Sequence, residues 1–169
     1  KNPKSPPSDS GSTSPRRSER DERIPLSSER REFYESLTWA KLTEDEEEYR
    51  SFYRHVSSQF AEEVVDCFVA IEKLTEAAES VEDGAELSHL VEEIYARYFQ
   101  EGRTEVNVGF AEKQEVEQRV GDFRNAVKEG QYVPRESVVD MFQSSAAELR
   151  MIISFELMKD YTIKKLAEL

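Results

Sequence analysis

The sequence is poor in several residue types that would define other classes of protein. It has one cysteine, Cys67, which cannot form an internal disulfide. No apolar run approaches the roughly 20 residues that a membrane-spanning helix needs. Only six glycines occur, and none lies in a Gly-x-x-x-x-Gly-Lys or Gly-x-Gly-x-x-Gly loop that would hold phosphate groups. We therefore expect a cytoplasmic protein without a membrane span, whose attachment to the inner face of a membrane would need other domains or partners.

Residues that support catalysis or metal binding are also scarce. The two histidines, His55 and His89, lie outside any His-Glu-x-x-His or Cys/His spacing that would hold zinc. His89 and Glu93 are four residues apart and form either half of a metal site or an ordinary surface pair, and the pair is the simpler interpretation. Cys67 sits on an apolar stripe, which favours a small core residue over a reactive thiol. The sequence thus predicts no catalytic residues, no metal and no cofactor.

The net charge of -13 is distributed unevenly along the chain. Residues 1 to 32 hold eight Lys and Arg against six Asp and Glu, so they carry +2 and the remainder carries -15. Such an acidic body repels the phosphate backbones of nucleic acids and the anionic lipids of membranes. The charge therefore favours protein partners and excludes a nucleic-acid surface.

The first residues differ in composition from the rest. Five of the six prolines fall within the first 25 residues, among Ser, Asp, Gly and Arg, with almost no large apolar side chains to offset the entropy of ordering. We predict a disordered tail or linker over residues 1–28 and a helical domain over 29–169. Ser5-Pro6, Ser14-Pro15 and Arg16-Arg17-Ser18 are candidate phosphorylation sites, with solvated filler as the simpler alternative.

The body has the apolar periodicity of consecutive helices and no strand alternation. Thr43 to Glu46 has the spacing of a capping box, in which Thr43 would begin a helix. Buried stripes at three- and four-residue spacing follow, listed here in order: Tyr49, Phe52, Tyr53 and Val56; Phe60, Val64, Val65, Cys67, Phe68 and Ile71; Leu87, Leu90, Val91, Ile94, Tyr95 and Tyr98.

The second half of the body continues the pattern with more breaks. An extended connector is predicted over residues 105–109 between Gly102 and a helix that carries Val116, Val120 and Phe123. A further break is predicted from Gly130 to Pro134. Residues 135–169 contain neither proline nor glycine and form one long helix or two helices with a bend near Ser144-Ser145.

Two segments resemble the regulator of G-protein signalling (RGS) homology domain family. Residues 60–72, Phe-Ala-Glu-Glu-Val-Val-Asp-Cys-Phe-Val-Ala-Ile-Glu, are similar to the signature in which Phe-Ser-Glu-Glu-Asn opens a helix that continues through Trp-Leu-Ala to Glu. Residues 94–99, Ile-Tyr-Ala-Arg-Tyr-Phe, and 105–108, Glu-Val-Asn-Val, resemble the family's Ile-Tyr-x-x-Tyr-Ile and Glu-Ile-Asn-Ile pair. Two linked motifs are more specific than either alone.

The resemblance implies an all-α bundle of about nine helices whose loops grip the switch regions of a GTP-bound G-protein α subunit. Such a domain stabilises the transition-state arrangement of the GTPase and donates no arginine finger, since the α subunit carries its own. The residues that match the family's contact loops are Ala61, Glu62, Glu63, Val64, Glu105 and Asn107, with Arg150 as the remaining match in the third loop.

The departures from the family's pattern lie in these same loops. Val64 replaces the asparagine that touches the catalytic glutamine of the partner, and its side chain can neither donate nor accept a hydrogen bond. In place of Asp-Ser-Tyr-x-Arg-Phe-Leu the chain has residues 144–152, without aspartate or aromatic side chain. Asn107 is the best single candidate for a retained contact, although it could equally cap a turn of the backbone.

Three hypotheses about function remain at this stage. The domain binds an activated α subunit and accelerates GTP hydrolysis; or it keeps the fold without the activity and serves as an interaction or scaffold module for another signalling protein; or it is an unrelated helical bundle.

Overall fold

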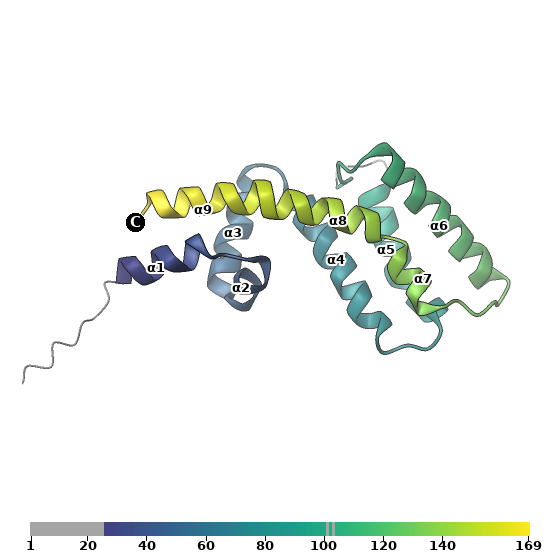
Figure 1. Cartoon of the computed structure of the whole chain (residues 1–169). Helices are drawn as coiled ribbons and strands as arrows, with labels where there is room; N and C mark the ends of the chain where they lie inside the picture. Colours follow the sequence, from purple (N-terminus) through teal and green to yellow (C-terminus); the bar gives the residue numbers. More distant parts are fainter. Residues whose placement is uncertain (1–25, 101, 103) are drawn as a thin grey trace, which may run out of the picture.

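The computed structural model describes residues 26–100, 102 and 104–169, and these form a helical bundle (Figure 1). The described residues contain no strand, only an isolated antiparallel bridge between Asp83 and Pro134. The elements are α1 (Leu26–Glu35), α2 (Trp39–Glu44), α3 (Glu46–Ser58), α4 (Glu62–Ala78), the 3-10 helix η1 (Gly84–Leu87), α5 (Ser88–Ile94), the π-helix η2 (Tyr95–Phe99), α6 (Phe110–Lys128), α7 (Arg135–Asp140), α8 (Gln143–Ile152), the π-helix η3 (Ile153–Leu157) and α9 (Met158–Ala167). The all-α prediction is confirmed.

The amino-terminal boundary of the helices lies slightly earlier than the domain prediction places it. α1 begins at Leu26, within the segment assigned to the tail. The rest of that assignment, residues 1–25, lies outside the described residues. The candidate phosphorylation sites of the sequence lie there too.

The helix start predicted at Thr43 is wrong. Thr43 lies inside α2, where its hydroxyl donates to the carbonyl oxygens of Trp39 and Ala40 at 3.1 and 3.0 Å. The residue that caps α3 is Asp45, whose carboxylate accepts from the backbone N–H of Glu48 at 3.0 Å. An aspartate is as good an N-cap as a threonine. Thr43 and Asp45 are only two residues apart, so residue spacing alone does not show which of them begins the helix.

The carboxyl-terminal stretch follows the two-helix alternative, with the break slightly before the expected bend. The chain turns at Met141 and Phe142, whose side chains are both buried. From Gln143 to Ala167, α8, η3 and α9 run on as one rod across the length of the bundle (Figure 1). The π-helical turn in the middle of this rod keeps Ile153 and Leu157 buried.

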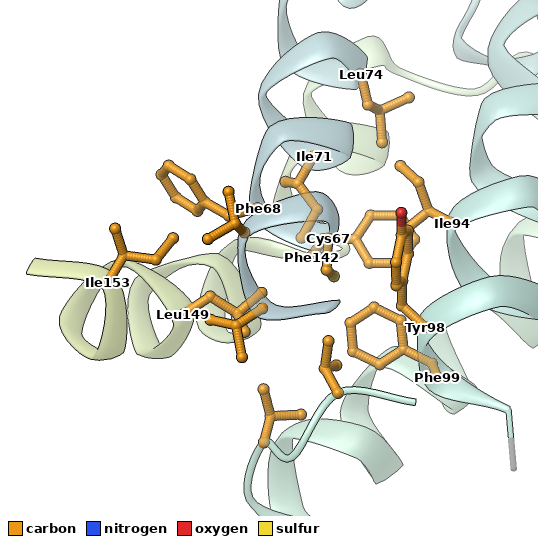
Figure 2. Close-up of a cluster of buried hydrophobic side chains, with 14 of the residues drawn as sticks. Cys67, Phe68, Ile71, Leu74, Ile94, Tyr98, Phe99, Phe142, Leu149 and Ile153 are labelled. Atoms are coloured by element: carbon orange, nitrogen blue, oxygen red, sulfur yellow. The ribbon is translucent and has the colours of Figure 1, made fainter. Parts of the chain in front are cut away.

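Helix α4 lies at the centre of the core. Its buried side chains contact α8 on one side and the η2 helix on the other, so that Phe68 faces Leu149 and Ile153 while Cys67 faces Tyr98 (Figure 2). The aromatic rings of Phe99 and Phe142 close the core beside them, with centroids 5.6 Å apart. This core fixes the two ends of α4 relative to the rest of the bundle.

Cys67 is a core residue, as the sequence predicts. The side chain is fully buried, and burial raises the pKa of its thiol. Because the thiolate is the reactive form, we expect thiol reagents at pH 8 to leave Cys67 unmodified in the folded chain and to label it once urea unfolds the protein. Labelling followed by mass spectrometry checks this, and an equal rate in the folded and unfolded chain would contradict it.

A second aromatic cluster joins the first and last helices of the described residues, α1 and α9. Tyr161 of α9 packs edge-on against Tyr34 of α1 and Phe52 of α3, with ring centroids 6.4 and 5.5 Å away. The hydroxyls of Tyr34 and Tyr161 both donate to the carboxylate of Glu48. Burial and the nearby Glu48 raise the pKa of Tyr34 to about 12, and the same two causes raise the pKa of Tyr161. No helix within the described residues is long and apolar enough to cross a membrane.

Candidate functional site

The turn between α3 and α4 exposes an aromatic side chain that the sequence assigns to the core. Phe60 is 86% exposed and has a positive φ of 57°, an uncommon conformation for a residue with a bulky side chain. The chain reverses direction at this residue, and α4 does not begin until Glu62. The buried stripe of α4 therefore starts only after this turn. The prediction that Phe60 belongs to that stripe, and thus to the core, is wrong.

The first turn of α4 holds the next three predicted site residues. Glu62 and Glu63 are half-buried, and their carboxylates complement the positive end of the helix dipole. One carboxylate oxygen of Glu62 is buried without a hydrogen-bond partner. Val64 is 7% exposed and belongs to the core cluster, so its side chain is not part of the exposed surface. Ala61, the residue before α4, is half-buried against the same core.

The connector between η2 and α6 is extended, as predicted, and alternates between core and solvent. Val106 and Val108 are buried, and the Val106 N–H donates to the carbonyl oxygen of Tyr98 at 2.9 Å. Asn107, between the two valines, is exposed, and no hydrogen bond joins its side chain to another described residue. Within the described chain Asn107 therefore does not cap a turn. Its amide is presented to solvent by a backbone that its neighbours hold in place.

Two carboxylates flank Asn107 along the connector. Glu105 forms an ion pair with Lys113 of α6, with Nζ and Oε1 2.6 Å apart and both side chains about 28% exposed. At the other end, the Gly109 N–H donates to the carboxylate of Glu148 at 3.1 Å. This bond ties the connector to α8 and brings the first turns of α8 to the same end of the bundle.

The structure separates Arg150 from the other predicted site residues. Glu148 faces the connector, and Arg150, two residues further on, points to a different side of α8, since successive residues are about 100° apart. There the exposed Arg150 lines a groove with Phe68 and Glu72 of α4 and with Phe155. The α8 side chain that reaches the connector is therefore an acidic one.

The start of α4 and the connector that follows Phe99 lie on the same side of the core cluster (Figure 2). Figure 1 likewise places the beginning of α4 beside the chain that enters α6. Exposed and half-buried residues of these two segments are together called the loop surface below. They are Phe60, Glu62, Glu63, Glu105, Asn107 and Phe110.

Phe60, Phe110 and Glu148 were not predicted as site residues. Phe110 is 75% exposed at the start of α6, directly after the connector. The residues three and four positions after it are Lys113 and Gln114, so no apolar stripe includes it, and this signal could have identified it. No comparable signal exists for Glu148, because only the fold brings it to Gly109.

The loop surface is mainly acidic, and Lys113, the cation nearest in the described connector and α6, is already paired with Glu105. Among the described residues no group of three or more His, Cys, Asp or Glu side chains could hold a metal ion. His89 and Glu93 form the exposed surface pair expected of them, 3.8 Å apart. The loop surface therefore has groups that can contact a protein partner: two exposed aromatic rings, the unpaired amide of Asn107 and several carboxylates.

A comparison with family models identifies the class of protein. The model for the regulator of G protein signaling domain matches residues 38–162, which is more than half of the chain. This chain therefore belongs to the RGS domain family, and its role lies in the regulation of G-protein signalling. Members of this family are accessory proteins of GTPases and not enzymes themselves. No curated protein gave a significant match to the chain.

Proposed function

We propose that this domain binds an activated heterotrimeric G-protein α subunit through the loop surface and accelerates its GTP hydrolysis. The observation that carries the proposal is Asn107, the exposed amide without a partner in the described chain, held between two buried valines. An amide both donates and accepts, so it can hydrogen-bond to the mobile switch segments of a GTPase. Its backbone is already ordered, so little entropy is lost on binding.

Acceleration in this scheme comes from ordering the partner and not from a reactive group of this chain. The α subunit supplies its own arginine and its own water-positioning glutamine. The domain holds the switch segments in the arrangement that the transition state requires, which lowers the barrier by pre-organisation. The exposed ring of Phe60 supplies apolar contact area on the loop surface, as aromatic anchors do at the centres of protein interfaces.

A second function is favoured by two other observations. Val64, at the family's asparagine position, is buried, and Glu148 occupies the α8 position beside the connector. Neither side chain can make the contacts that the corresponding loops of the family make. Both observations favour a module that binds a signalling protein without accelerating hydrolysis.

The two functions are distinguished by single-turnover GTP hydrolysis. The full chain is added to a panel of α subunits, and binding is measured to each subunit in its GDP form and in its transition-state-analogue form. Acceleration together with preference for the analogue form is expected. Asn107→Ala should reduce the acceleration by about tenfold, the effect of losing one well-placed hydrogen bond to a charged or desolvated group.

The matched control is Gln118→Ala, which removes an exposed amide from α6 outside the loop surface. This variant should leave hydrolysis unchanged. Preferential binding to the analogue form without acceleration would identify the second function. An absence of both across the panel would sink the proposed partner.

A further inference from the structure

A cavity between α3 and α9 gathers positive charge on a chain that is otherwise strongly acidic. Its volume is about 370 Å³, within the range of roughly 300–1,000 Å³ usual for small-ligand pockets. It lies between the second half of α3 and the last two turns of α9. The side chains at its rim are Ser51, Arg54, Ser58, Lys164, Lys165 and Glu168.

Two of the three cations at this cavity form no close ion pair with a described carboxylate. Arg54 donates only to the carbonyl oxygen of Arg50, at 3.4 Å, and Lys164 forms no ion pair, although its charge helps to lower the pKa of Asp160 one turn earlier. Lys165 lies 3.4 Å from Glu168 and over the ring of Tyr161. The lysines also complement the negative end of the α9 dipole, but this does not explain why Arg54 faces them from another helix.

The cavity is also lined by a buried polar side chain that has an unused hydrogen-bonding atom. His55 lines it, is more than nine-tenths buried and has a ring nitrogen, Nδ1, without a partner. Its other nitrogen, Nε2, lies 3.0 Å from Asp160. Gln59 also donates to Asp160, and these two contacts hold the pKa of that carboxyl below its usual value. Among the lining residues Glu168 is thus the one anion, against three cations and a histidine, and Asp160 is joined to the cavity through His55.

We propose that this cavity, called the α3–α9 pocket, binds a phosphate monoester, and that its source is a phosphoserine in the first 25 residues of the same chain. A phosphoserine carries about -1.5 to -2 charges at pH 7 and three strong acceptor oxygens. Arg54 and Lys164, from opposite walls, supply charge-assisted donors, while the hydroxyls of Ser51 and Ser58 are already hydrogen-bonded to Tyr161 and to the carbonyl oxygen of His55. The proposal is independent of the proposed binding of an α subunit.

The position of α1 supports this source of the phosphate. Tyr34 of α1 packs on Tyr161 of α9, and the start of α1 lies beside the end of α9 (Figure 1). Ser18 precedes Leu26 by eight residues, which span up to roughly 28 Å when extended. A tethered ligand of this length has an effective concentration in the millimolar range, so modest affinity is sufficient. The acidic body, in contrast, repels an anionic membrane.

The modification itself is an ordinary phosphoryl transfer. A kinase transfers the γ-phosphoryl group of a nucleoside triphosphate to the serine Oγ, which loses its proton, and the nucleoside diphosphate leaves. Ser14, which precedes a proline, and Ser18, which follows two arginines, have the sequence contexts that kinases recognise. Before the transfer the anions of the tail are carboxylates, each with a single charge and two acceptor oxygens.

The test is a titration of the unphosphorylated full chain with synthetic peptides of residues 10–22 that carry phosphate on Ser14 or Ser18. At least one phosphopeptide should bind about tenfold or more tightly than the unmodified peptide, because its phosphate adds charge-assisted hydrogen bonds. Inorganic phosphate should compete with it. The double variant Arg54→Gln/Lys164→Gln should abolish this preference.

The matched control is Arg50→Gln/Lys159→Gln, which removes the same charge from the same two helices outside the pocket. This control should retain the preference. Glu168→Gln should tighten binding, because it removes the carboxylate at the rim, and a purely structural role of the cations would not predict this. Equal binding of phosphorylated and unmodified peptides, an equal loss in both double variants, or binding to phosphoinositide vesicles in place of the peptides would overturn the proposal.

Discussion

Tyr161→Ala is expected to lower the free energy of unfolding by about 3–5 kcal/mol, the usual cost of truncating a large buried aromatic side chain. Tyr161 is 1% exposed, and its ring touches residues of α1 and α3 from its place on α9. Its hydroxyl donates to Glu48. The substitution would leave a cavity at the junction of α1, α3 and α9. Urea denaturation of the full chain, followed by circular dichroism, measures the change.

Two further variants separate the contributions of this side chain. Tyr161→Phe keeps the ring and should cost about 1–2 kcal/mol, because it removes only the hydrogen bonds of the hydroxyl with Glu48 and Ser51. Tyr132→Ala is the matched control: this tyrosine is 66% exposed and donates to the carbonyl oxygen of Glu82, so the cost should stay below about 1.5 kcal/mol. If Tyr161→Ala cost no more than Tyr132→Ala, the junction would contribute little to stability.

Phe60→Ala is expected to weaken binding to the activated α subunit by about 2 kcal/mol or more, a factor of roughly 30, while stability changes by less than about 0.5 kcal/mol. The ring is 86% exposed, so the fold gains little from it. A bulky residue at positive φ is unfavourable, and alanine at the same φ removes bulk without adding strain. Calorimetric titration with the transition-state-analogue form of the subunit measures the effect.

The control for this experiment is Phe155→Ala. Phe155 is 64% exposed but lies on η3 in the groove with Arg150, away from the loop surface. It should leave binding unchanged. Equal binding by Phe60→Ala and the unmodified chain would remove the aromatic anchor from the proposed interface and leave Asn107 as its main contact.

Much of the fold could be predicted because apolar periodicity reports burial directly. Most members of the stripes that contain Phe52, Val91 and Val120 are buried as expected, whereas Tyr49, Tyr53 and Leu90 are only partly buried. The failures, at Thr43 and Phe60, both occur where one helix ends and the next begins. At such a boundary the apolar periodicity of one helix ends and that of the next begins. A residue before the boundary can therefore match the spacing of the following helix by coincidence.

The candidate site could be predicted only where the motif also fixes the conformation of the backbone. Two valines that alternate with Asn107 predict an exposed asparagine on an extended segment, and the structure agrees. Spacing along the chain could not show that Arg150 points away from the connector while Glu148 touches it, since this depends on how α8 is rotated against its neighbours. Membership of a contact loop and exposure at its surface are separate properties, as Val64 illustrates.

The rod formed by α8, η3 and α9 has a consequence for the assembly of complexes. Glu148, near one end, touches the connector of the loop surface, and Lys164, near the other, lines the α3–α9 pocket. At about 1.5 Å per residue these positions are roughly 24 Å apart along the axis. A partner bound at the loop surface and a ligand bound in the α3–α9 pocket would therefore touch different ends of one continuous rod.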